Sequence, residues 1–434
     1  MTTSSVRVAV LGAGIRGTTH SRHIRRAGGV VTAIAEPDPG RRHRFAAEHD
    51  LPAEACFSDW RDLARAGVRR YDAVLITTQD DDHAEPCVRF AELGRHILCE
   101  KPMAPTEADA LGMVEAVERA GVIFAVVHSL RYMPYTDALV RLLGEGRIGR
   151  LVSVQHLEPV GAWHFAHSYV RGNWRREDQS SSLLMAKCCH DLDWLSHIIG
   201  ARPTRVASFG GLTHFRPEHR PTGAAERCLD CAVEPDCPYS APRLYLSCLG
   251  DSGREQWPLA AVTSNPTEEA VVQALRDGPY GRCVYACDND VVDHQVVALE
   301  YSNGVTATHT VTAFTEMGHR QTRLFGTHGS IETDCRQITV HDFRAHPNIA
   351  STILDAHPGG PDPALVDHGD GDYGAIAAFL TALTTGDVTS IRTGPRESLD
   401  SHRVVWAAER ARHSATTVAM PDPAEGITMT GAMP

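Results

Sequence analysis

The sequence predicts an α/β Rossmann doubly wound domain followed by an α+β domain with a large, mostly antiparallel open sheet. Three observations support this prediction. In the first 130 residues, apolar strands alternate with helices, which is the spacing of βαβ units and of a parallel sheet covered on both faces. A glycine-rich turn follows the first strand directly. Beyond residue 130, strands follow one another with few helices between them, which is typical of an antiparallel sheet.

The first domain, residues 1–130, is defined by five strands and three helices. Thr106 and Asp109 form a capping-box pattern at the start of the third helix, and Gly94 ends the second. The predicted strands are Val6–Leu11, Val30–Ala35, Ala73–Thr78, Ile97–Glu100 and Val122–His128. The predicted helices are one that ends at Gly28-Gly29, one from Asp82 to Leu93 and one from Thr106 to Ala120.

The second domain, residues 131–420, contains a long irregular insertion at 214–290, and residues 421–434 are expected to form a loose tail. Asn303-Gly304 predicts a two-residue hairpin turn, and Asp372 is placed to cap a helix. The predicted strands are Arg150–Glu158, Gln295–Tyr301, Val305–Val311, Arg320–Phe325, Ser330–Thr333 and Gln337–Val340. The predicted helices are Ser182–Gly200, Tyr373–Thr384 and Ser398–Ala415.

The charge and the composition restrict the class of protein. A formal net charge of −12 argues against a partner such as a nucleic acid or an anionic membrane, because both need a basic face. No apolar run approaches the roughly 20 residues of a membrane-spanning helix, and residues 1–5 show no signal-peptide pattern. We therefore expect a cytoplasmic protein whose 12 cysteines are thiols or metal ligands rather than disulfides.

Residues 12–17 match the pattern G-x-G-x-x-G between a strand and a helix, the context in which this pattern binds dinucleotides. The first glycine permits the tight turn, the second lets the backbone approach the pyrophosphate, and the third allows close contact between helix and strand. The helix N-terminus then offers free N–H groups to the phosphates. The expected cofactor-binding residues of this turn are Gly12, Gly14, Ile15, Arg16 and Gly17.

Glu36 ends the second strand and is expected to select the cofactor. A carboxylate at this place accepts hydrogen bonds from the adenosine ribose and repels a 2′-phosphate. We therefore expect NAD rather than NADP. Arg41 and Arg42 follow closely and could tolerate the extra phosphate, so the preference is moderate.

A second motif, Glu100-Lys101-Pro102, stands at the end of a later strand. Three further segments occur in a matching order: Thr77-Thr78-Gln79 with His83, then His128–Tyr135, then Gly326–Ser330. Together with the glycine-rich turn, these residues resemble the glucose–fructose oxidoreductase and inositol dehydrogenase (Gfo/Idh/MocA) family. The resemblance spans nearly the whole chain except the insertion.

The resemblance implies a division of labour between the two domains. The first would bind NAD(P), and the second would hold the substrate against its sheet. The open face of that sheet commonly serves as an oligomer interface, so a homodimer or homotetramer is implied. The cofactor contacts that the resemblance implies are Thr77, Thr78, Gln79, His83, Glu100 and Lys101.

Lys101 is the first candidate catalytic residue. Hydride transfer needs a group that takes or gives the alcohol proton. Lys101 stands at the carboxyl end of a parallel strand, where open α/β sheets bind their ligands. Its ammonium group can bond the reacting oxygen and stabilise the negative charge that develops there.

His190 is the second candidate, because imidazole titrates near neutrality. Its segment resembles the family's helix with the pattern Asp-x-x-x-His-x-x-Asp. His190 and Asp193 match the later positions, but Ala186 occupies the first. Lys187 lies one turn before His190 and is expected to replace the missing carboxylate in binding, though not as a base. Asp191 is expected to orient these groups.

An aromatic and polar cluster in residues 163–176 suits a sugar, because aromatic faces stack on sugar rings and polar groups bond hydroxyls. A solvated loop, or a loop that contacts a neighbouring subunit, is an equal alternative. The expected substrate-binding residues are Trp163, His164, Trp174, Arg131, Tyr132 and Asp191.

Three cysteines lie close together in the insertion, and a fourth comes from its far end: Cys228, Cys231, Cys237 and Cys283, with Cys287 as a substitute for the last. Four thiolates suit a closed zinc site that staples a segment with little core of its own. An iron–sulfur cluster and free thiols are the alternatives. Any metal here would be structural, because a catalytic zinc keeps an open position.

Three functions follow from these residues. The first is NAD(P)-dependent oxidation or reduction of a hydroxyl in a small-molecule sugar, cyclitol or sugar-derived substrate. The second is a redox-neutral reaction of a dehydratase, epimerase or glycosidase, by transient oxidation and elimination. Ala186 favours the second, because the acid–base set then differs from that of a plain dehydrogenase. The third is a non-catalytic dinucleotide sensor, against which Lys101 and His190 count.

Overall fold

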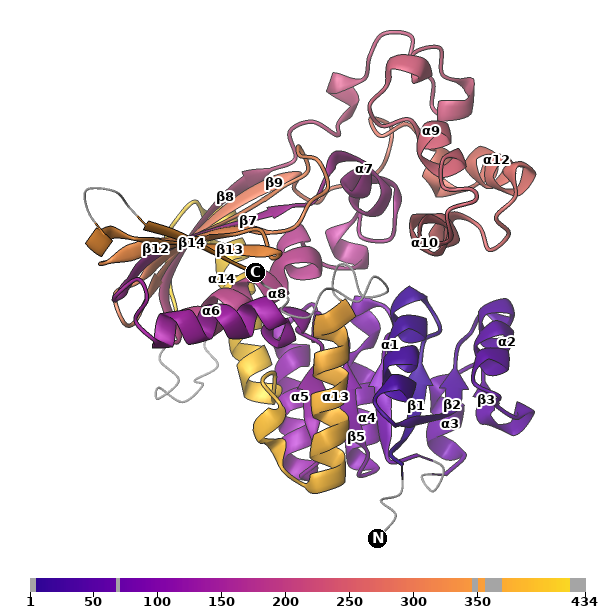
Figure 1. Ribbon diagram of the computed structural model, residues 1–434. Coiled ribbons are helices and arrows are strands. Elements are labelled where there is room, and N and C mark those ends of the chain that lie inside the picture. The colour runs from indigo at the N-terminus through magenta and orange to yellow at the C-terminus, as the bar shows by residue number, and fades with distance from the viewer. Residues whose placement is uncertain (1–4, 68–70, 346–349, 356–368, 422–434) are drawn as a thin grey trace.

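The computed structural model describes residues 5–67, 71–345, 350–355 and 369–421, and these form two sheets with their covering helices (Figure 1). One sheet has six strands and the other has nine. The predicted fold class is confirmed. None of the described helices is both long enough and apolar enough to cross a membrane.

The six-stranded sheet is parallel throughout and has the order β3-β2-β1-β4-β5-β6. This is the doubly wound order, with its crevice beyond the carboxyl ends of the strands. The strands are β1 (Arg7–Leu11), β2 (Val30–Ala35), β3 (Cys56–Phe57), β4 (Ala73–Ile76), β5 (His96–Cys99) and β6 (Phe124–Val126). The helices are α1 (Ile15–Arg26), α2 (Pro39–Glu48), α3 (Trp60–Arg65), α4 (Ala84–Glu92) and α5 (Glu107–Ala120).

The nine-stranded sheet has the order β14-β13-β12-β11-β7-β10-β9-β8-β15. Only β7 and β10 pair in parallel, so the sheet is mostly antiparallel. The strands are β7 (Leu151–Pro159), β8 (Pro203–Gly211), β9 (His294–Tyr301), β10 (Thr306–Thr312), β11 (Gln321–Gly326), β12 (Gly329–Thr333), β13 (Gln337–Asp342), β14 (Ala350–Asp355) and β15 (Val418–Ala419).

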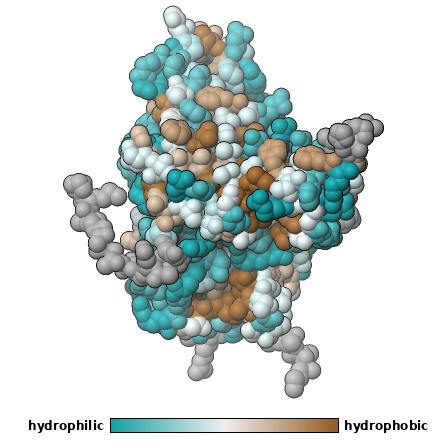
Figure 2. Space-filling model, turned by 90° about the vertical axis from the view of Figure 1, so that its left-hand side faces the viewer, coloured by the Kyte–Doolittle hydropathy of each residue, from teal (hydrophilic) through white to brown (hydrophobic). Residues whose placement is uncertain are grey.

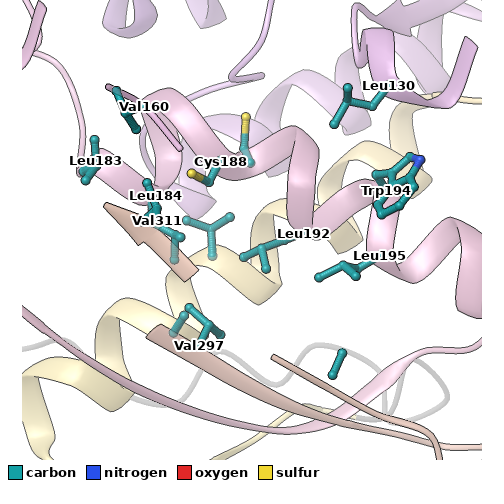
Figure 3. Packing of buried hydrophobic residues seen from close by; sticks show 14 of the residues in the cluster. Leu130, Val160, Leu183, Leu184, Cys188, Leu192, Trp194, Leu195, Val297 and Val311 are labelled. Atoms are coloured by element: carbon teal, nitrogen blue, oxygen red, sulfur yellow. The ribbon is translucent and has the colours of Figure 1, made fainter. Parts of the chain in front are cut away.

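Helix α8 (Leu183–Ile199) covers one face of this sheet and carries the candidate histidine. Ser182 caps its N-terminus through its side chain, and Gly200 ends it in the left-handed conformation. Figure 3 shows its side chains, among them Leu184 and Leu192, directed toward Val297 and Val311 of the sheet. Burial of each such side chain stabilises the fold by about 1.5–3 kcal/mol, so the sheet fixes the position of α8. Helix α6 (Pro134–Gly144) lies at the junction between the domains.

The last two helices return to the Rossmann domain, where α13 (Gly369–Thr385) packs beside α1 and α14 (Pro395–Ser414) beside α5 (Figure 1). Ile376, Phe379 and Leu380 of α13 belong to the core of the Rossmann sheet. The C-terminal segment therefore completes the first domain, a contact that reading the chain in order does not reveal.

The insertion projects from the second domain (Figure 1); its first part, to residue 240, is irregular as predicted, and its later part contains short helices that were not predicted. Its helices are α9 (Ala241–Leu246), α10 (Ser252–Arg254), α11 (Ala260–Val262) and α12 (Glu268–Asp277). They surround a small separate core that includes Tyr245, Leu259 and Leu275. Trp257 connects the insertion to α7 (Ala162–Phe165), since its ring lies 5.1 Å from that of Trp163.

Candidate active site at the carboxyl edge of the Rossmann sheet

The glycine-rich turn between β1 and α1 has the shape of a phosphate cradle. Gly12 has a φ of +92°, and a Cβ atom there would lie 2.6 Å from the carbonyl oxygen of Thr77. A Cβ atom on Gly17 would lie 2.0 Å from the carbonyl oxygen of Gly12. By contrast, a Cβ atom on Gly14 would meet nothing within 4 Å, and no side chain caps α1. The backbone N–H groups at Gly14 and Ile15 thus adjoin open space, which fits a pyrophosphate.

Glu36 braces this turn from the end of β2. Its carboxylate accepts hydrogen bonds from the N–H groups of Ala13 (2.7 Å) and Asp38 (2.9 Å), and the residue is only 4% exposed. Each carboxylate oxygen can accept more than one hydrogen bond. A role toward the ribose thus stays a prediction, and the structure adds a role in shaping the turn.

The side chain of Arg16 is held by two carboxylates of the protein. Its guanidinium pairs with Glu100 and, at 2.9 Å, with Asp372 of α13. Asp372 was expected to cap a helix, and instead it joins α13 to the glycine-rich turn and accepts a hydrogen bond from Ser129. Burial would raise the pKa of Glu100, but Arg16 and His20 outweigh it and hold this pKa well below its usual range.

The loop after β4 is tied to both motifs. Thr77 Oγ1 donates to the carbonyl oxygens of Leu11 and Gly12, each at 2.9 Å. The ring nitrogen Nδ1 of His83 donates to the carbonyl oxygen of Pro102 at 2.8 Å. Thr78 Oγ1 donates to Asp82, and Gln79 is exposed. Thr77 and His83 therefore hold the backbone of the two motifs, whereas Gln79 is available to a ligand.

Lys101 bridges the two domains. It follows β5, its peptide bond to Pro102 is cis, and its Nζ donates to the carbonyl oxygen of Ala186 on α8 at 2.6 Å. This contact places the ammonium group one helical turn before His190, beside the position that the family's pattern gives to a carboxylate. The structure therefore brings Lys101, Lys187 and His190 into one region.

Arg320, just before β11, contacts His190. Its Nη2 lies 2.7 Å from His190 Nε2, and a guanidinium can only donate. This contact makes Nε2 an acceptor and favours a proton on Nδ1 of a neutral His190, whereas Asp191, whose Oδ2 lies 3.3 Å from the same Nε2, favours the opposite tautomer. Burial is the main cause that lowers the pKa of His190 well below its usual value; Asp191 opposes this effect and Arg320 adds to it.

A buried network of alternating charges surrounds this pair. Glu158 of β7 forms ion pairs with Lys187 Nζ at 3.2 Å and with Arg320 at 3.0 Å. Asp191 is fully buried and pairs with Arg320 and, at 2.9 Å, with His156. The role of Asp191 as an orienting residue fits its contacts, whereas direct substrate binding does not, because its oxygens face the protein interior.

Arg131 and Tyr132, expected to bind substrate, instead fasten the domain junction. The guanidinium of Arg131 forms two 2.7 Å hydrogen bonds with the carboxylate of Asp193. The Tyr132 hydroxyl accepts from the N–H group of Arg392 at 2.8 Å and contacts Thr393 at 3.1 Å. Their hydrogen-bonding groups are thus engaged by the protein itself.

The aromatic cluster lies where the insertion meets the second domain. Trp257 contacts both Trp163 and His164, with a ring separation of 4.8 Å to the latter. Trp174 Nε1 lies 3.5 Å from a carboxylate oxygen of Asp80, and burial raises the pKa of Asp80. Trp163 and His164 are therefore partly covered by the insertion, and Trp174 approaches the catalytic region through Asp80.

Sequence reasoning missed three charged residues of this region: Asp80, Glu158 and Arg320. Asp80 directly follows Gln79, a predicted cofactor contact, so this neighbouring position could have identified it as a site residue. Glu158 stands at the end of a predicted strand, and Arg320 begins another. Neither has a local motif, because their partners stand far away in the sequence, the nearest being Lys187, 29 positions after Glu158, and only the fold brings them together.

The structure brings together the four cysteines that were predicted to bind a metal, but it does not arrange them as metal ligands. Cys228, Cys231, Cys237 and Cys283 all line one cavity in the insertion. Across the described parts of the chain, however, no three histidine, cysteine or acidic side chains stand in a metal-binding arrangement.

Comparisons with known proteins agree with this architecture. Levoglucosan dehydrogenase in complex with NADH and levoglucosan has a TM-score of 0.72 at 18% identity, covering 96% of this chain and 100% of that one. An oxidoreductase from Agrobacterium radiobacter in complex with NAD+, L-tartaric acid and magnesium has a TM-score of 0.67 at 18% identity, covering 96% and 98%. At this identity, these likenesses show the fold alone.

The two relatives described next match only part of this chain by sequence. Inositol 2-dehydrogenase of Corynebacterium glutamicum is 31% identical over 208 residues, or 46% of this chain and 56% of that protein. The 2,7-anhydro-N-acetylneuraminate hydratase of Escherichia coli (strain K12) is 31% identical over 147 residues, or 34% and 38%. The chain thus spans about half or less of each of these two relatives.

Two family descriptions together cover most of the chain. The oxidoreductase family with an NAD-binding Rossmann fold matches residues 6–128, and the C-terminal alpha/beta domain of the same family matches residues 140–420. The glycine-rich turn, the Lys101 motif and the mixed second sheet all lie within these matches. The chain therefore belongs to the Gfo/Idh/MocA family of NAD-binding oxidoreductases.

Proposed function

We propose that the protein transfers hydride between NAD(H) and a hydroxyl-bearing carbon of a sugar, cyclitol or sugar-derived substrate. The observation that carries this proposal is that lysine, rather than arginine, occurs at only two positions. Of the 42 basic residues other than histidine, only two are lysines, Lys101 and Lys187. Both lie at the candidate site, one bonded to Ala186 and the other paired with Glu158.

Lysine differs from arginine in a way that matters for this chemistry. An ammonium group can lose a proton under mild conditions, whereas a guanidinium stays charged. The chain uses arginine at nearly every other basic position, so the lysine at position 101 indicates a requirement that arginine does not meet. Proton transfer at Lys101 Nζ is such a need.

The residues divide the work as follows. NAD, when bound, supplies the hydride acceptor. Lys101 Nζ bonds the reacting oxygen, stabilises its negative charge and exchanges a proton with it. The contact with Arg320 favours a proton on Nδ1 of His190, which then serves as a hydrogen-bond donor. Glu158 neutralises Lys187 and keeps that side chain in place.

A redox-neutral reaction is the second candidate. Ala186 stands where the family's pattern has an acidic residue, and one relative is named as a hydratase.

One experiment separates these functions. Purified protein is incubated with inositol, levoglucosan, 1,5-anhydro-D-fructose and 2,7-anhydro-N-acetylneuraminate, in each direction, while NADH absorbance and product mass are followed. Net change in NADH supports the first proposal. Product without net NADH supports the redox-neutral reaction. Binding of NADH without turnover of any of these compounds contradicts both.

A further inference from the structure

The insertion contains a cavity of about 20 Å³ lined by Cys228, Cys231, Cys237 and Cys283. A cavity of roughly 10–15 Å³ on this measure accommodates one water-sized particle, so its size suits a single ion. The four thiols come from separated stretches of chain. Arg227 and Arg282 form an isolated bridge that brings the first and last together, and the Cys283 N–H donates to Glu226 at 2.8 Å.

The buried, positively charged side chain of Arg171 lines the same cavity. Arg171 is 1% exposed, and its guanidinium donates to the carbonyl oxygens of Arg282 (2.7 Å) and Tyr239 (2.8 Å). Its Nη2 also lies 3.5 Å from Cys228 Sγ. Its Nη1 has no hydrogen-bond partner, and no acidic residue of the described chain pairs with it. Burying a charge without an opposite charge is costly, so an anionic group beside Arg171 would be favourable.

We propose that Cys228, Cys231, Cys237 and Cys283 bind one Zn²⁺ ion as four thiolates, with Arg171 as their counter-charge. Four protons leave the thiols for solvent as four Zn–S bonds form. The resulting site has a net charge of −2, which the guanidinium partly offsets. Disulfides would be neutral and would leave Arg171 without a balancing charge, so they fit the cavity less well.

Binding requires a local adjustment, because the four thiols are not yet in a metal-binding arrangement. Zn–S bonds are about 2.3 Å long, so the side chains must turn inward toward the centre of the cavity. Cys228 begins a short 3-10 turn and Cys237 directly follows another, so both cysteines stand on segments of a single turn. The ion would then fasten the base of an insertion whose own apolar core is small.

Metal analysis of the full chain, purified without a polyhistidine tag and dialysed against metal-free buffer, tests this proposal. We expect about one zinc ion per chain, and loss of most of it in the Cys231→Ser and Cys237→Ser variants. Cys248→Ser is the matched control, because Cys248 is buried in the same insertion but does not line the cavity. Absence of zinc, iron in its place, or full zinc in Cys237→Ser overturns the proposal.

Two further measurements test the site without any cysteine variant, so they remain informative if such a variant fails to fold. In the unaltered chain, maleimide labelling followed by peptide mass spectrometry should show the four thiols protected until a zinc chelator is added. Equal labelling with and without chelator contradicts the site. Arg171→Met should release zinc to a chelator about tenfold more readily, in the range for residues that support metal ligands. Arg171→Lys, which keeps the charge, should release it less readily than Arg171→Met.

Discussion

At the scale of the residue, we expect substitution by arginine to have opposite effects at the two lysines. Lys101→Arg keeps a positive charge but removes a group that can exchange a proton. We expect kcat to fall by roughly 10²–10⁴, with NADH affinity within a few-fold. Lys187→Arg can still pair with Glu158 and should keep most activity. Turnover assays and NADH fluorescence titration check both variants, and equal activity of the two would remove Lys101 from proton transfer.

His190 offers a second residue-scale prediction, because its two ring nitrogens have different partners. Asparagine can place an amide N–H near the Nδ1 position, whereas glutamine reaches only the Nε2 position that faces Arg320. We therefore expect His190→Asn to keep about tenfold more kcat/KM than His190→Gln, a difference of about 1.4 kcal/mol. The reverse order would mean that Nε2, not Nδ1, faces the substrate.

The tautomer can also be observed without any substrate. In protein labelled with ¹⁵N-histidine, long-range proton–nitrogen spectra distinguish a protonated from an unprotonated ring nitrogen, and the His190→Gln variant identifies the signal. We expect Nδ1 protonated at neutral pH in the unaltered chain. Removal of the donor in Arg320→Gln should release this preference, and Arg320→Lys should restore part of it. A signal that is the same in all three proteins would leave Arg320 without this role.

At the scale of the element, the turn that begins α1 separates folding from binding. Alanine at Gly14 meets no atom within 4 Å, so Gly14→Ala should melt like the unaltered chain. Its methyl group would occupy the pyrophosphate position and weaken NADH binding by tenfold or more. Gly17→Ala forces a Cβ against the Gly12 carbonyl oxygen and should lower both the melting temperature and NADH affinity. Thermal melts and NADH titrations of both variants decide, and a destabilised Gly14→Ala would contradict this division.

Elements with a strong local pattern could be predicted from the sequence. Strand β2 and the cap of α5 at Thr106 were found because apolar runs and capping residues are encoded within a few positions. Strands β3, β8, β14 and β15 were missed, and β3 and β15 have only two residues each. The helices of the insertion were missed because proline, glycine and cysteine conceal their short apolar faces.

The candidate site shows the same limit. Lys101 and His190 were recognised because each belongs to a local motif. Arg320 was not, because its contact with His190 spans 130 positions of the chain. The pairing of Arg131 with Asp193 was not predicted either, because Asp193 lies 62 positions away on another element. Residues that act through long-range ion pairs carry no signal in a single sequence.

At the scale of the whole molecule, the open face of the nine-stranded sheet carries exposed apolar side chains. Phe209 of β8 is 70% exposed and pairs with Val296 of β9, which is 38% exposed, while Ile353 of β14 is 66% exposed. Figure 2, which looks from the side of β12 and β14, shows apolar patches between polar residues. Large exposed apolar areas of this kind mark interaction surfaces.

We propose that this face joins copies of the chain into a homodimer or a homotetramer. Light scattering coupled to size-exclusion chromatography should give a mass two or four times that of the chain. Phe209→Glu should shift it toward the monomer, because a buried unpaired carboxylate at an interface is strongly unfavourable. Val388→Glu, on the Rossmann side and 51% exposed, should leave the mass unchanged. A monomeric unaltered chain, or an assembly that tolerates Phe209→Glu, would place the interface elsewhere, since Phe209 projects from the sheet into any partner stacked on this face.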